Sequence, residues 1–163
     1  MKDTIVIGIS DQRTSKSPNT LVTYALGSCV GVSLYDETTN IGGMAHIMLP
    51  DSALMRGAKS MDRMKFADTA IADLLDKMVV QGANRSRITA KIAGGANMFK
   101  MSDGSGLGSI GQRNIASVKQ VLFDLGVPII AEDVGKDFGR TIFFDLDTGK
   151  VRVRSLGKNV REM

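Results

Sequence analysis

The stretch LGSCVGVSLYDETTNIGGMAHIML, residues 26–49, decides the fold. Apolar, β-branched runs on both sides flank the pentapeptide Asp36-Glu-Thr-Thr-Asn40, which is rich in turn-forming residues. Two such runs joined by a short turn predict an antiparallel β-hairpin. The stretch also contains the only cysteine of the chain, Cys29, and its only histidine, His46.

Outside this hairpin, the sequence alternates strand patterns with two amphipathic helices. Apolar residues at three- and four-residue spacing predict one helix through Met64, Ala67, Ile71, Leu74 and Met78, ended by Gly82, and another through Ile115, Val118, Leu122 and Leu125. Strands are expected at 4–9, 21–26, 30–35, 41–49, 87–93, 127–132, 141–146 and 151–156, with loops at 11–19, 50–60 and 94–111. This pattern predicts a single α+β domain over residues 1–163.

Composition excludes several classes of protein. The chain has 163 residues, of which 43% are hydrophobic and 23% charged. One cysteine cannot form an internal disulfide, and one cysteine with one histidine cannot supply the usual three or four Cys/His ligands of zinc. No apolar run approaches the ~18–20 residues of a membrane span, and Asp3 interrupts the N-terminal apolar segment. We therefore expect a cytoplasmic protein with no cofactor, no metal and no direct membrane insertion.

The net charge of +4 is mildly basic and is densest near the end of the chain. In Lys150-Val-Arg-Val-Arg154, basic and apolar residues alternate, so a strand would place Arg152 and Arg154 on one exposed face. Such a face is either simply solvated or a docking patch for a partner. No aromatic residue lies among these charges to stack nucleic-acid bases, so a nucleic-acid partner is not expected.

Cys29 and His46 each have two interpretations. Cys29 follows Gly27-Ser28 at the start of a strand, where a thiol is rigidly held yet accessible. A lone cysteine is nevertheless most often a small buried hydrophobe. His46 lies in an apolar strand, and is either a satisfied core residue or a positioned base. When each residue is considered alone, the structural interpretation is favoured over the catalytic one.

The hairpin changes that balance because it brings the two residues together. Two registers place Cys29 and His46 on the same face: the one that pairs them directly, and the one that pairs Gly31 with His46, with Cβ atoms ~5–8 Å apart. The intermediate register separates them, unless a bulge at Gly42-Gly43 restores the parity. The only thiol and the only imidazole are therefore expected to be neighbours.

A neighbouring imidazole can take the proton of a thiol and so generate the nucleophilic thiolate. A third group is then needed to orient the imidazole ring. Thr23, on the preceding strand, has a hydroxyl that could accept the histidine ring N–H, although a threonine is also an ordinary strand residue. Backbone N–H groups around Gly27, Ser28 and Cys29 are candidates for stabilising an oxyanion.

The glycine-rich segment contains a literal G-x-G-x-x-G motif, Gly106-Leu-Gly-Ser-Ile-Gly111. A dinucleotide-binding fingerprint needs a strand that runs directly into the first glycine, and here residues 94–105 intervene. A loop that closes over a site or docks a partner is the favoured interpretation of this segment.

The motifs that carry these residues resemble the CheD family of chemoreceptor glutamine deamidases. The matching stretches run in family order over nearly the whole chain: Leu26-Gly-Ser-Cys-Val30, Gly43-Met-Ala-His-Ile-Met-Leu-Pro-Asp51, Ala90-Lys-Ile-Ala-Gly-Gly-Ala-Asn-Met-Phe99, Ile110-Gly with Arg113-Asn114, Ala131-Glu-Asp133 and Gly139-Arg140.

The resemblance implies hydrolysis of glutamine side-chain amides on the cytoplasmic helices of methyl-accepting chemotaxis receptors. It implies Cys29 as nucleophile, His46 as base and Thr23 as the orienting residue, in a β-sandwich-like core flanked by helices as in bacterial toxin deamidases. The phosphatase CheC is an implied partner. A non-catalytic module that binds receptor or CheC stays open as an alternative, and so does transglutaminase activity. The oligomeric state and the choice of receptor glutamines stay undetermined.

Overall fold

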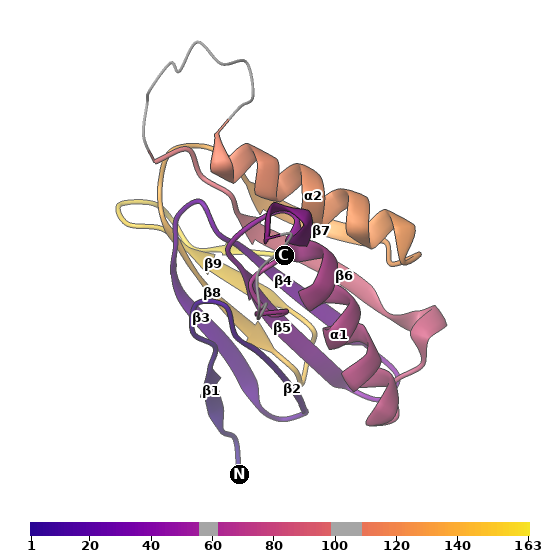
Figure 1. Ribbon diagram of the computed structural model, residues 1–163. Coiled ribbons are helices and arrows are strands. Elements are labelled where there is room, and N and C mark those ends of the chain that lie inside the picture. The colour runs from indigo at the N-terminus through magenta and orange to yellow at the C-terminus, as the bar shows by residue number, and fades with distance from the viewer. Residues whose placement is uncertain (56–61, 99–108) are drawn as a thin grey trace.

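The computed structural model describes residues 1–55, 62–98 and 109–163, which form two five-stranded sheets and two α-helices (Figure 1). The strands are β1 (Thr4–Val6), β2 (Gln12–Lys16), β3 (Thr20–Leu26), β4 (Val30–Asp36), β5 (Ile41–Ile47), β6 (Thr89–Gly94), β7 (Ile129–Val134), β8 (Arg140–Asp145), β9 (Val151–Arg154) and β10 (Arg161–Glu162). The helices are α1 (Ala67–Val80) and α2 (Ile110–Asp124), with short 3-10 turns at Ser52–Met55 and Arg85–Arg87.

The two sheets pack as a sandwich. Sheet A has the order β1-β3-β8-β9-β10 and sheet B the order β2-β5-β4-β6-β7, with parallel pairing only for β1–β3 and β6–β7. Side chains from both sheets share one apolar cluster, which includes Leu21 and Phe144 from sheet A and Met44 and Ala93 from sheet B. The expected β-sandwich core is therefore confirmed.

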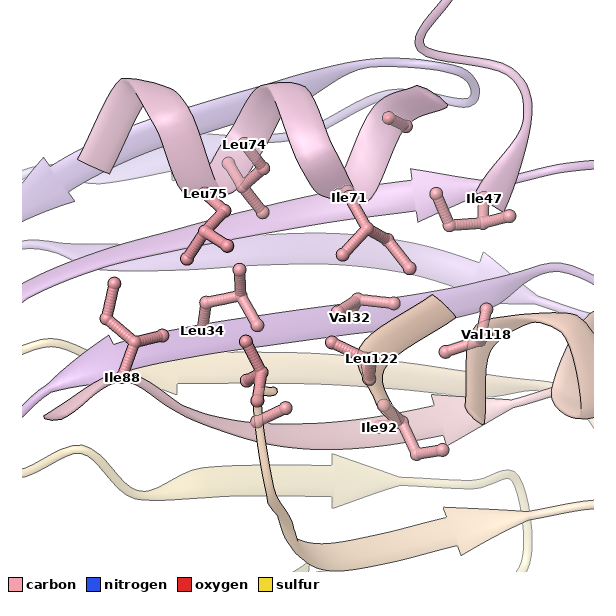
Figure 2. Close-up of a cluster of buried hydrophobic side chains, with 14 of the residues drawn as sticks. Val32, Leu34, Ile47, Ile71, Leu74, Leu75, Ile88, Ile92, Val118 and Leu122 are labelled. Atoms are coloured by element: carbon pink, nitrogen blue, oxygen red, sulfur yellow. The ribbon is translucent and has the colours of Figure 1, made fainter. Parts of the chain in front are cut away.

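The helices cover the other face of sheet B (Figure 1). Figure 2 shows Ile71, Leu74 and Leu75 of α1 directed toward the apolar side chains of β4 and β5. The periodicity that predicts the helices thus corresponds to a single buried stripe on each. Because sheet B is covered by helices on one face and by sheet A on the other, its central strand β4 is buried along almost its whole length.

Close packing between layers requires glycine at particular places. A Cβ atom on Gly31 of β4 would lie 2.6 Å from Cδ1 of Ile142 in sheet A, and one on Gly43 of β5 would lie 2.7 Å from Cδ1 of Leu74 in α1. Gly31 and Gly43 thus permit the sheet–sheet and helix–sheet approaches respectively.

The predicted hairpin is confirmed as β4 and β5, with Gly31 paired to His46. This is one of the two registers that place Cys29 and His46 on one face. The two amphipathic helices are confirmed as well, although Met64 precedes α1 and Leu125 is the C-cap of α2, and α2 begins at a capping box formed by Ser109 and Gln112.

The prediction of a loop over 11–19 is wrong, because β2 pairs there with β5 along five residues. β2 is an edge strand, so only one of its sides needs a backbone partner, and its side chains are polar. The polar composition of this segment and the nearby Ser-Pro-Asn turn signal both predict a loop, so the sequence does not indicate β2. Strand boundaries also differ: β1 ends at Val6 rather than residue 9, β7 is shifted two residues later, and the short β10 was not expected.

The expected exposure of Arg152 and Arg154 is confirmed, since both side chains lie on the outer face of β9. Their guanidinium carbons lie 5.3 and 5.1 Å from the ring centroid of Phe143 on β8. The aromatic partner that the local sequence lacks is therefore supplied by the neighbouring strand, and its ring is already occupied by cations of the chain itself.

An ion pair between a buried carboxylate and an exposed arginine lies at the end of β4 that is farther from Cys29. Asp36, the last residue of β4, is fully buried and accepts hydrogen bonds from Nε and Nη2 of Arg87, both at 3.0 Å, and from the N–H groups of Asn84 and Thr38. Burial alone would raise the pKa of Asp36, but these donors together hold that pKa well below its usual range.

We predict that Asp36→Asn lowers the free energy of unfolding at pH 7 by about 2–3 kcal/mol, because it weakens several charge-assisted hydrogen bonds to a buried acceptor. Urea denaturation measures this loss. The matched control is Asp73→Asn, which breaks the exposed pair of Asp73 with Arg63 (2.8 Å) and should cost much less. Equal losses in the two variants would contradict the prediction.

Candidate active site

Cys29 lies where the chain crosses from one sheet to the other. β3 belongs to sheet A and β4 to sheet B, and Gly27, Ser28 and Cys29 make the crossing. The Cys29 side chain is half-buried and packs against the apolar cluster between the sheets. The thiol is thus held on a short, tightly connected segment at the rim of the sandwich.

His46 lies on β5 and is 1% exposed. It is opposite Gly31 on β4, and Cys29 lies two residues before Gly31, just ahead of the first residue of that strand. The ring of His46 contacts Thr23 of sheet A and Cys29 packs against the cluster between the sheets, so both side chains lie on the face of sheet B that meets sheet A.

Thr23 reaches His46 from the opposite sheet. Its Oγ1 lies 2.7 Å from Nδ1 of His46 and 2.7 Å from the carbonyl oxygen of Ile7. A carbonyl only accepts, so the single hydroxyl proton of Thr23 is donated to Ile7, and Oγ1 accepts from Nδ1–H. This arrangement fixes the tautomer of the neutral ring and leaves the lone pair on Nε2.

The buried surroundings keep both groups neutral. Burial lowers the pKa of His46 from 6.5 to about 4, and burial also raises the pKa of the Cys29 thiol above its ordinary value of 9.0. Nε2 of His46 is buried and has no hydrogen-bond partner among the described residues. At neutral pH the site therefore holds a thiol and an unprotonated imidazole nitrogen that is available as a base.

The backbone around Cys29 is held through its carbonyl groups. The N–H of Ala96 donates to the oxygen of Gly27 (2.8 Å) and the N–H of Gly95 to the oxygen of Cys29 (2.8 Å). Gly94 has φ of +109°, and a Cβ atom there would lie 2.3 Å from the Cys29 oxygen. Only glycine fits this conformation and this contact, so the pair Gly94-Gly95 is a support for the cysteine segment.

The third carbonyl of the segment is held by a residue to which the sequence assigned no role. Nδ2 of Asn114, on α2, donates to the oxygen of Ser28 (2.9 Å) and to that of Met48 (3.0 Å). The only sequence signal was its place in the Arg113-Asn114 motif.

The expected contact of Thr23 with His46 is present. The first half of the glycine motif, residues 106–108, lies outside the described residues.

The described part of the chain contains no group of three or more His, Cys, Asp or Glu side chains that could hold a metal ion. Within that same part, no helix is long and apolar enough to cross a membrane.

Fold and site together define an α+β sandwich protein with a cysteine–histidine–threonine cluster at one rim. Residues 48–155 match the family model described as CheD chemotactic sensory transduction. A Clostridium novyi protein named "Probable chemoreceptor glutamine deamidase CheD" is 50% identical over 160 residues, covering 98% of each chain. A Moorella thermoacetica protein of the same name is 46% identical over 158 residues, 96% of this chain and 93% of that one.

The chain belongs to the CheD family. In structure, it is similar to the Bacillus licheniformis hypothetical protein YfiH, with a TM-score of 0.46 and 16% identity over 76% of this chain and 49% of that one. A likeness at this level carries no argument about activity.

We predict that the buried neutral state of His46 makes stability depend on pH. Between pH ~6.5 and ~4 the unfolded chain binds a proton that the native ring does not, so the free energy of unfolding falls on acidification, by on the order of 3 kcal/mol. Chemical denaturation of wild type and His46→Asn across this range tests it. The variant should lack this component of the pH dependence, and parallel profiles would contradict the assignment.

Proposed function

We propose that the protein hydrolyses glutamine side-chain amides of methyl-accepting chemotaxis receptors to glutamate, with release of ammonia. The proposal is supported by membership of a family whose curated relatives are named chemoreceptor glutamine deamidases. The single observation that carries the chemistry is the hydrogen bond from His46 Nδ1–H to Thr23, because it leaves Nε2 as the base on the face that also bears Cys29.

In the proposed reaction, Sγ of Cys29 attacks the carboxamide carbon while Nε2 of His46 takes the thiol proton. Because both groups start neutral, proton transfer accompanies the attack. The imidazolium then gives the proton to the amide nitrogen and the C–N bond breaks. Ammonia departs, and Cys29 is left as a thioester with the substrate. Water next loses a proton to Nε2 and attacks the thioester, the C–S bond breaks to release glutamate, and the imidazolium returns the proton to Sγ, which restores the thiol and the neutral ring.

The tetrahedral intermediates carry a negative oxygen, and we propose backbone N–H groups of the cysteine segment as its donors. Gly27, Ser28 and Cys29 are the candidates, and the carbonyls of Gly27 and Ser28, which precede the N–H groups of Ser28 and Cys29, are both hydrogen-bonded within the protein. In a trans peptide the N–H opposes the preceding C=O, so fixing a carbonyl also fixes the direction of the next N–H. Such preorganised donors typically provide a large part of the stabilisation in acyl transfer.

The proposed substrate lies on the cytoplasmic helices of the receptors, which would place the enzyme in the cytoplasm. The family resemblance adds CheC as a proposed partner. A binding module without turnover is the principal alternative, and a thioester intercepted by an amine would give transglutamination instead of hydrolysis.

We predict that Cys29→Ala abolishes deamidation while the fold and receptor binding persist, because the chain has no other thiol. Mass spectrometry of receptor peptides measures the mass change on conversion of an amide to a carboxyl group, and circular dichroism checks the fold. Deamidation that persists in the variant would rule out the nucleophile. A wild type that binds receptor but never converts glutamine would favour the binding module.

We predict that Thr23→Val lowers kcat by about 10- to 100-fold, part of the ~10²–10⁴-fold that a positioned acid–base group contributes. Valine keeps the shape of threonine but removes the acceptor for Nδ1–H, so the ring loses its fixed tautomer. Thr20→Val, another buried threonine of β3, is the matched control and should leave kcat unchanged. Equal kcat values for wild type and Thr23→Val would contradict the orienting role.

A further inference from the structure

Asn114 is a buried polar residue whose position is not explained by packing. It lies in the second turn of α2, is 0% exposed and faces sheet B. Its Oδ1 has no hydrogen-bond partner among the described residues. Burial of an unpaired acceptor costs free energy, so an apolar side chain would be the better filler at this place. What asparagine provides at this position, and an apolar side chain could not, is the two hydrogen bonds from Nδ2.

These hydrogen bonds connect the ends of the two strands that bear the cysteine and the histidine. The ladder between β4 and β5 ends at the pair Val30–Ile47. Beyond that pair, Nδ2 of Asn114 donates to Ser28 on one side and to Met48 on the other. Carbonyl oxygens only accept, so the atom that faces them must be the amide nitrogen. The side chain thus continues the connection where the ladder stops.

The bond to Ser28 also fixes the peptide that contains the N–H of Cys29. The Ser28–Cys29 bond is trans, so this N–H points opposite to the Ser28 carbonyl. Asn114 binds that carbonyl from α2, which packs on the helix-covered face of sheet B. The N–H of Cys29 is therefore directed away from α2, and it donates no hydrogen bond to any described residue.

The neighbouring peptides do not depend on a side chain in this way. The carbonyls of Gly27 and Cys29 are bound by backbone N–H groups of Ala96 and Gly95, which only a substitution by proline would remove. Of the three peptides in the crossing, the one that presents the N–H of the nucleophile is held by a side chain alone.

We propose that Asn114 is a positioning residue for the reaction, whose side-chain amide orients the Ser28–Cys29 peptide so that the N–H of Cys29 can donate to the oxyanion. The inference rests on the proposed function, because an oxyanion forms only if Cys29 attacks an amide carbon. Asn114 itself touches no reacting atom. Its contribution is to the transition state and not to thiol reactivity or substrate binding.

The test compares Asn114→Ala with Ser117→Ala on the same helix. Oγ of Ser117 donates to the carbonyl of Pro50, so its loss also removes a bond from α2 to a backbone carbonyl, one turn away from Asn114. For both variants we would measure kcat and KM for receptor deamidation, the melting temperature, and the rate of Cys29 alkylation by iodoacetamide. Alkylation requires the thiol but no oxyanion donor. It therefore distinguishes a change in the orientation of the Ser28–Cys29 peptide from a change in the reactivity of the thiol.

For Asn114→Ala we expect kcat to fall by about 10- to 100-fold, below the ~10²–10³-fold cost of deleting an oxyanion donor outright, because the N–H is retained but misdirected. KM and the alkylation rate should stay within about twofold of wild type. Ser117→Ala should keep the wild-type kcat. If Asn114→Ala does not fold, Asn114→Ser keeps one donor and should show the same pattern with a smaller fall in kcat.

A folded Asn114 variant with the kcat of Ser117→Ala would overturn the proposal, and so would an alkylation rate that falls in parallel with kcat. These results are read against wild type and Cys29→Ala in the same assay. If the wild-type protein does not deamidate receptor, the proposed function is wrong, and the proposed role of Asn114 is wrong with it.

Discussion

The pairing of β4 with β5 is the constraint on which the other features of the molecule depend. β4 is the central strand of sheet B, so its alternate side chains enter the helix-covered core and the core of the sandwich. A shift of one residue would exchange these two sets and move Gly31 away from Ile142, where only glycine fits. The same register pairs His46 with Gly31, two residues after Cys29. Packing and the geometry of the site are thus fixed by one ladder.

The site itself needs both sheets. His46 lies on sheet B, Cys29 on the crossing between the sheets, and Thr23 reaches the ring from sheet A. Because the imidazole is buried, the pKa of His46 is lowered by desolvation, and no charged group of the described residues contributes to the shift. A neutral base at neutral pH is the state that an attacking thiol requires, so the same burial that excludes water from the ring also prepares it for proton transfer.

Much of this architecture is predictable from the sequence, and the parts that are not have physical reasons. The hairpin and both helices follow from apolar periodicity, because each buries a continuous face. β2 was missed because an edge strand can be polar, and its pairing with β5 is a tertiary contact. The proximity of Cys29 and His46 follows from strand pairing. The side from which Thr23 approaches depends on how two sheets dock, and the contacts of Asn114 are to backbone carbonyls, which leave no pattern in the side chains.

The raised pKa of Cys29 has a consequence for the chemical durability of the protein. Oxidation by peroxide proceeds through the thiolate, so a thiol that stays protonated until a substrate is engaged is a poor target for oxidants. The protection depends on the docked sandwich. A chain whose sheets have separated would expose Cys29 as an ordinary thiol, with a larger thiolate fraction and faster oxidation than in the folded protein.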